Sequence, residues 1–142
     1  MSHPLHPALV HFPIACWSLA TFSDIAGFWW GAPAWQLGGA MLAIGTATSL
    51  AAMAAGFVEL LKVPAEHSAS RDLNLHVALV LGAFCFYVGS LMLRWSGGLL
   101  GRPTIAAVAL DGAGFTLLGA AGWIGGKLVY EHRLGTAVSS KQ

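Results

Sequence analysis

Four long apolar runs, separated by short polar segments, divide the chain. They cover residues 8–30, 36–61, 74–95 and 104–130. Each is as long as the roughly 20 residues that a helix needs to cross a hydrocarbon core of about 30 Å. A transmembrane barrel would instead show alternating segments of about ten residues, and the sequence has none. The pattern predicts an all-α polytopic membrane protein, an antiparallel four-helix transmembrane bundle forming one domain with no obvious internal repeat.

Short segments of turn-forming residues join these runs. Gly31, Ala32 and Pro33 follow the first run, Pro64 follows the second, and residues 96–103 separate the third from the fourth. Of the 142 residues, 56% are hydrophobic and only 9% are charged, and the mean hydropathy is +0.69. These polar residues are too few to cover a soluble domain. We therefore expect the lipid bilayer as the surroundings, and no nucleic-acid partner.

The basic residues are distributed unevenly between the two sides of the predicted bundle. The side with both termini carries Lys62, Arg71, Lys127, Arg133 and Lys141, whereas the other carries Arg94 and Arg102. Cytoplasmic loops of membrane proteins have an excess of lysine and arginine, so this distribution predicts cytoplasmic termini. No basic residue precedes the first run, which is long enough to span. We interpret it as a retained helix, not a secretory signal.

All six histidines fall on the side of the termini: His3, His6, His11, His67, His76 and His132. At a rise of about 1.5 Å per residue, four side chains from four helices lie within one or two turns of the same level. This predicted ring consists of His11, Glu59, His76 and Tyr130. It is the candidate functional site. The alternative is that these are interfacial side chains bonded to water or to backbone carbonyls.

A b-type haem is the first cofactor that this ring would suit. Such a haem needs two axial imidazoles on facing helices and basic groups near its propionates. The first and third spans lie diagonally in an antiparallel bundle, so we expect His11 and His76 as axial ligands, with His132 and His6 as further candidates. Other expected contacts lie near the aqueous edge: Arg71, Lys127, Arg133 and Tyr130.

Two stripes of small residues favour a large flat ligand. The second run carries Gly45, Ser49, Ala52 and Gly56, and the fourth carries Gly112, Gly119, Gly122 and Gly126. Such stripes are also typical of close packing between membrane helices. If a haem is bound, we expect both stripes to face the porphyrin.

Three other interpretations remain open. Non-haem iron or zinc is one, with a ligand set of His11, His76, His132 and Glu59. Proton or quinone handling without a metal is the second, because histidines titrate near neutral pH. The third is a cofactor-free structural or assembly subunit. We rank haem first because the glycine stripes favour a large flat ligand.

The opposite side of the bundle carries a different polar group. One face of the third run holds His76, Val80, Ala83, Tyr87, Ser90 and Arg94 at helical spacing. Arg94 has two acids at comparable depth, Asp24 in the first run and Asp111 in the fourth. Ionisable groups within a membrane are usually paired. We expect structural ion pairs that join three helices here, with a proton or ion pathway as the alternative.

Prolines leave the start of the first helix open. The first 13 residues contain Pro4, Pro7 and Pro13, and a proline within a helix removes a backbone hydrogen bond. Either the helix begins near Phe12 with Pro13 in its first turn, or it begins near Pro7 and is kinked.

Two sequence segments carry a resemblance to a known family. His-Pro-Ala-Leu-Val-His-Phe-Pro-Ile-Ala at residues 6–15 and Gly-Gly-Lys-Leu-Val-Tyr-Glu-His at residues 125–132 resemble the bacterial membrane proteins of domain of unknown function 2231. The resemblance covers nearly the whole chain, and His6, His11, His76 and His132 match histidines of the pattern. The chain departs from it after His132, where Arg133-Leu134 replaces Gly-Val.

The resemblance implies a four-helix membrane domain of undefined activity, with relatives joined to Rieske-type iron-sulfur domains. Together with the histidines, it favours a redox protein in the bacterial inner membrane that binds haem b. We expect electron transfer to or from a quinone or an iron-sulfur partner, and an electron carrier or subunit instead of a stand-alone enzyme. Small-residue faces make a homodimer plausible.

Overall fold

The chain forms four long helices. The computed structural model describes residues 5–61, 63–64, 68–96 and 99–134. A short helix α1 (Leu5–Leu9) precedes α2 (His11–Trp30), and α3 (Ala32–Leu60), α4 (Ser70–Arg94) and α5 (Ile105–Tyr130) follow. The four long helices have the length and apolar composition of membrane spans. The predicted all-α polytopic architecture is confirmed.

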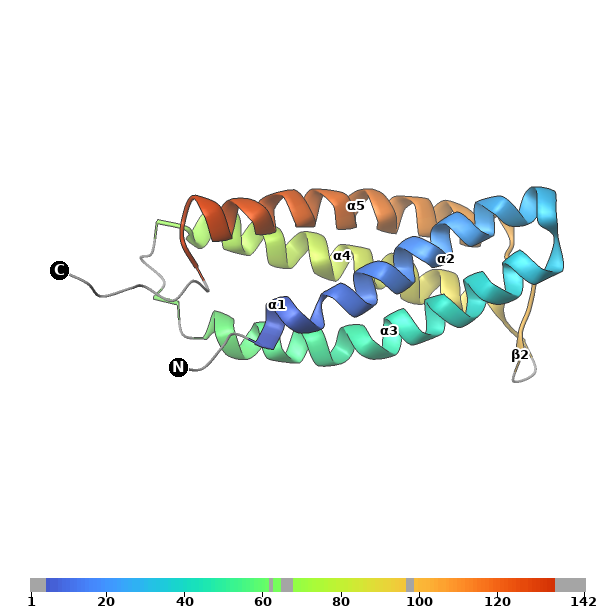
Figure 1. Cartoon of the computed structure of the whole chain (residues 1–142), viewed down its shortest axis with the longest axis horizontal. Helices are drawn as coiled ribbons and strands as arrows, with labels where there is room; N and C mark the ends of the chain where they lie inside the picture. Colours follow the sequence, from blue (N-terminus) through green and yellow to red (C-terminus); the bar gives the residue numbers. More distant parts are fainter. Residues whose placement is uncertain (1–4, 62, 65–67, 97–98, 135–142) are drawn as a thin grey trace.

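Two helical hairpins make up the bundle (Figure 1). Helix α2 packs along α3 and α4 packs along α5, while α2 meets α5 and α3 meets α4 over shorter stretches. Helices α2 and α4 are therefore diagonal. The start of α1 and the end of α5 lie at one end of the molecule, which we call the histidine end. The opposite end, where α2 turns into α3, is called the hairpin end.

Two connections differ from the sequence expectation. Only Gly31 separates α2 from α3, because Pro33 is accommodated in the first turn of α3, where its missing N–H would have had no partner. Gly31 has a φ of 69°, a conformation that glycine adopts without a steric penalty. Between α4 and α5, β1 (Trp95–Ser96) pairs antiparallel with β2 (Leu99–Leu100), a small hairpin that the sequence pattern did not predict.

The first helix combines the two expected starts. α1 runs into α2 through Val10, whose N–H donates to the carbonyl of His6 at 3.0 Å and whose carbonyl accepts from Ile14 at 3.2 Å. Pro13 lies in the first turn of α2 and cannot donate to the carbonyl of Leu9. Helical bonding therefore continues past Val10, with an interruption that Pro13 explains.

Burial is uneven along the bundle. The largest fully buried side chains lie from its middle to the hairpin end: Leu42, Ser49, Tyr87, Ser90, Asp24, Arg94 and Asp111. Toward the histidine end, Ala69 and Leu128 are buried, but several inward positions are only half-buried, including His6, Gly56, Glu59, His76 and Gly125. The two hairpins thus form a closed core at one end and a less sealed contact at the other.

The two hairpins repeat each other, which corrects the expectation of no internal repeat. Residues 6–10 read His-Pro-Ala-Leu-Val and residues 76–80 read His-Val-Ala-Leu-Val, a shift of 70 positions. In α3 and α5 the shift is 69: the buried positions 38, 42, 45, 49 and 52 correspond to 107, 111, 114, 118 and 121. Both hairpins start at the histidine end, so they are parallel repeats about an axis along the bundle.

Candidate functional site

Two pairs of residues related by the repeat meet across the bundle axis. Trp17 and Tyr87 stack with ring centroids 4.6 Å apart and planes at 11°. Asp24 and Arg94, seven positions further along each helix, form an ion pair. The third pair of this series is His6 and His76, eleven positions before the aromatic pair. His6 and His76 occupy equivalent positions in the two hairpins.

The two imidazoles are held in matching ways. His6 Nδ1 lies 2.8 Å from the carbonyl oxygen of Ala52, and His76 Nδ1 lies 2.9 Å from that of Ala121. A carbonyl only accepts, so the proton of each neutral ring belongs on Nδ1. Nε2 then presents a lone pair, the arrangement in which histidine binds a metal. Neither Nε2 has a hydrogen-bond partner within the described part of the chain.

Equivalent glycines lie against the two rings. A Cβ at Gly56 would come within 2.8 Å of His6 Cε1, and one at Gly125 within 3.2 Å of His76 Cε1. Each ring thus occupies space that a side chain would fill. Each glycine also follows its carbonyl partner, Ala52 or Ala121, by one helical turn. The two histidine sites are therefore repeats of one design.

Only one of the two expected small-residue stripes faces inward. On α3, Gly45 contacts the Trp17 ring and Gly56 contacts His6, as the stripe requires. On α5, a Cβ at Gly112, Gly119, Gly122 or Gly126 would have no neighbour within 4 Å. The inward glycines of α5 are Gly114, which lies against Tyr87, and Gly125. The prediction for the fourth span was wrong, because the glycines that it chose lie on a different face of α5 from the glycines that contact the other helices.

The predicted ring is not assembled as expected. His11 is exposed, because five residues along a helix rotate it by about 140° from His6. Tyr130 is also exposed, at 84%. Glu59 does lie at the site, where its Oε1 accepts from the backbone N–H of His6 at 3.2 Å. Of the two histidines, His6 is half-buried and His11 is exposed.

Two of the other predicted residues, Lys127 and His132, belong to a polar cluster at the histidine end. Asp72 Oδ2 lies 2.8 Å from Lys127 Nζ and 3.0 Å from His132 Nε2. His132 is thereby directed to an acid at the end of the bundle and away from the role of an iron ligand. Arg71 is exposed, and Arg133 has a φ of 54°. His3, His67, Lys62 and Lys141 lie outside the described residues.

A three-ligand metal site is not found. In the described ranges, no group of three or more histidine, cysteine, aspartate or glutamate side chains has a geometry suited to a metal ion. His11, His76, His132 and Glu59, the expected ligands for iron or zinc, are not brought together. What the structure offers instead is a pair of imidazoles.

The expected ion pairs at the hairpin end are present. Arg94 Nη2 donates to Asp111 Oδ2 at 2.9 Å and to Asp24 Oδ2. All three side chains have no exposed area. Depth along the helices was enough to predict this group, because Arg94 has no other acid at its level.

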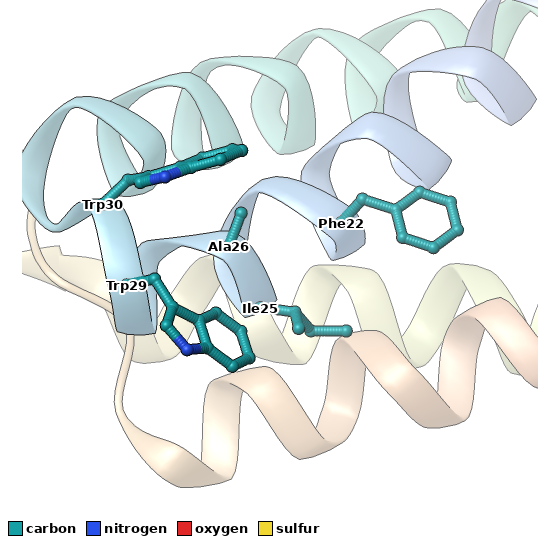
Figure 2. Close-up of a pocket in the computed structure, with 5 residues that line it drawn as sticks. All are labelled: Phe22, Ile25, Ala26, Trp29 and Trp30. Atoms are coloured by element: carbon teal, nitrogen blue, oxygen red, sulfur yellow. The ribbon is translucent and has the colours of Figure 1, made fainter.

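A hollow on the outer face of α2 lies near the same end. Its volume is about 390 Å³, and Figure 2 shows Trp29 and Trp30 on either side of Ala26, with Phe22 and Ile25 completing the lining. The five lining residues are all apolar or aromatic. Such a surface suits a lipid chain, and the paired tryptophans suit the membrane interface.

Comparison with known proteins agrees with the architecture. The family model described as a predicted membrane protein, DUF2231, matches residues 2–138. Neither the curated proteins nor the solved structures provide a significant match. Because the family model covers nearly all of a chain with four membrane-spanning helices, the chain belongs to the DUF2231 family of membrane proteins.

Proposed function

We propose that the chain is a membrane redox protein that binds one b-type haem between its two hairpins, with His6 and His76 as axial ligands. One observation carries the proposal. Each imidazole has its Nδ1 on a backbone carbonyl, of Ala52 or Ala121, and a Nε2 available to iron. This hydrogen bond is the usual support of a metal-binding histidine, because it fixes both the tautomer and the ring orientation.

The surroundings of the two rings fit such a cofactor. His6, His76 and the two glycines against them are half-buried, so the two rings are not sealed within the core. Gly56 and Gly125 leave each ring free of a neighbouring side chain. Arg71, Lys127 and Arg133 supply positive charge near the propionates, although Lys127 already pairs with Asp72. When bound, the haem iron supplies reversible one-electron transfer.

The site lies near one surface of the membrane, so its redox partner approaches from that side. We propose a quinone or an iron-sulfur subunit as this partner, and a homodimer as the assembly. Among the described basic residues, Arg71, Lys127 and Arg133 lie at the histidine end and Arg94 and Arg102 at the other. By the positive-inside rule, the histidine end and both termini face the cytoplasm of a bacterial inner membrane.

Absorption spectra of the purified protein in detergent test this function. The reduced form is expected to show a Soret band and sharp α and β bands. His6→Ala and His76→Ala should each abolish the low-spin spectrum, because each removes one axial ligand. His11→Ala is the matched control and should keep it, since His11 is of the same type, lies near the same end and is exposed. His132→Ala should keep it as well.

Other outcomes would contradict the assignment. Loss of the bands in His11→Ala but not in His6→Ala would restore His11 as the ligand. A colourless protein with stoichiometric iron or zinc would indicate a non-haem centre. A protein with neither metal nor colour would indicate a structural or assembly subunit.

A further inference from the structure

The ion group at the hairpin end has an unbalanced charge. It contains two carboxylates, Asp24 and Asp111, and a single guanidinium, Arg94. If both acids were ionised, the group would carry a net charge of −1 with no exposed side-chain area. An uncompensated charge in such surroundings is strongly unfavourable, because burial removes the water that would solvate it.

The two carboxylates share one nitrogen. Oδ2 of Asp24 and Oδ2 of Asp111 both accept from Nη2 of Arg94. They are therefore close neighbours, and two carboxylates that share a site repel each other when both are ionised. Such a pair commonly retains one proton between its members.

Several polar atoms of the group have no hydrogen-bond partner among the described residues. These buried atoms are Oδ1 of Asp24, Oδ1 of Asp111, Nε and Nη1 of Arg94, and Oγ of Ser90. Ionised carboxylates only accept hydrogen bonds, whereas a protonated one also donates. A proton would give the unpartnered carboxylate oxygens a donor.

The surrounding elements supply no further charge. On α3, a Cβ at Gly38 would collide with Asp24, and Gly39 lies against Leu100 of β2, near Nη1 of Arg94. The N–H of Gly101 donates to the carbonyl of Arg94 at 2.9 Å and holds the β-hairpin at this end. Arg102, the other basic residue here, is exposed and stacks over the Trp35 ring at 4.3 Å.

We propose that the Asp24–Arg94–Asp111 group is a proton-binding site that holds one proton shared between its two carboxyl groups, which makes the buried group neutral. A proton is the ligand that fits because the adjacent Arg94 guanidinium would repel a metal cation, while Oδ1 of both carboxyl groups has no hydrogen-bond partner among the described residues. The proposal is independent of haem binding, since the site is at the opposite end of the bundle from His6 and His76.

Infrared spectroscopy of the full chain in lipid tests the proton site. At a pH of about 8, carboxyl groups with ordinary pKa values near 4 are ionised and give no carboxylic-acid C=O band. The wild-type protein is expected to show one such band, which shifts in D₂O. Asp24→Asn and Asp111→Asn should each remove it, because the remaining carboxylate then balances Arg94.

Glu59→Gln is the matched control, since Glu59 is the half-buried acid of the histidine end and should not hold this proton. The band is expected to persist in this variant. Absence of the band in the wild type would overturn the proposal, as would its persistence in both asparagine variants. Loss of the band in Glu59→Gln would overturn it too, and this comparison does not depend on the folding of the asparagine variants.

Discussion

At the scale of single residues, the histidine pair is defined by what surrounds each ring. The carbonyls of Ala52 and Ala121 orient the rings through Nδ1. Gly56 leaves the space that the His6 ring occupies. A backbone acceptor and a missing side chain thus act together at each site. Because Gly56 lies against the ring, even a small side chain at that position would displace the ring.

Gly56→Ala should therefore displace the His6 ring. Its Cβ would lie 2.8 Å from two ring atoms, closer than van der Waals contact allows. We expect a loss of about 1–3 kcal/mol, typical of overpacking, and a lower haem occupancy. Unfolding followed by circular dichroism in detergent measures the first effect, and absorbance measures the second. Gly122→Ala is the control, because its Cβ would meet nothing within 4 Å, and it should be neutral or slightly stabilising. Equal effects of the two substitutions would contradict the packing.

At the scale of helices, the diagonal pair α2 and α4 supplies the aromatic residues at the centre of the core, and α3 and α5 add Leu42 and Leu118. Trp17 and Tyr87 stack across the axis, and Gly45 and Gly114 lie against their rings. This alternation of large and small residues sets the spacing of the four helices. The core therefore depends on the aromatic pair.

Trp17→Ala should strongly destabilise the bundle. Trp17 is 2% exposed, and its removal is expected to cost about 3–5 kcal/mol by loss of burial and formation of a cavity. The midpoint of unfolding in a mild detergent series measures this loss. Trp123→Ala is the matched control, since Trp123 is 81% exposed on α5 and should change stability by less than about 0.5 kcal/mol. A comparable loss at Trp123 would indicate that its outer face is covered in the native protein.

The sequence predicted how deep each residue lies along its helix, but it left open which face of the helix that residue occupies. Apolar length was sufficient for the four spans, and depth was sufficient for the ion group, because Arg94 can reach any acid at its level. Depth was insufficient for the histidines: His11 and His6 lie about a turn and a half apart but point in different directions. The His-x-Ala-Leu-Val repeat was the sequence signal that favoured His6. It was obscured because other matched positions carry different residues, such as Asp24 and Arg94.

At the scale of the whole molecule, the parallel repeat makes the two membrane faces unequal. Two hairpins that start on the same side place both histidines at one end and the ion group at the other. An antiparallel repeat would have distributed each group over both faces. The repeat thus separates a half-buried end, where we propose the cofactor, from a closed end that holds charge. Orientation in the membrane then decides which compartment the cofactor would exchange electrons with.

Labelling of introduced cysteines tests that orientation. Leu99→Cys lies in β2 at the hairpin end and Glu131→Cys follows α5 at the histidine end, and both positions are exposed. Cys16 and Cys85 are replaced by serine in each variant, so that only the new thiol reacts. If the basic histidine end faces the cytoplasm, a membrane-impermeant maleimide should label Leu99→Cys in intact spheroplasts, and Glu131→Cys only after lysis. The reverse pattern would place the histidine pair at the outer surface, and an electron donor or acceptor would then have to approach from outside the cell.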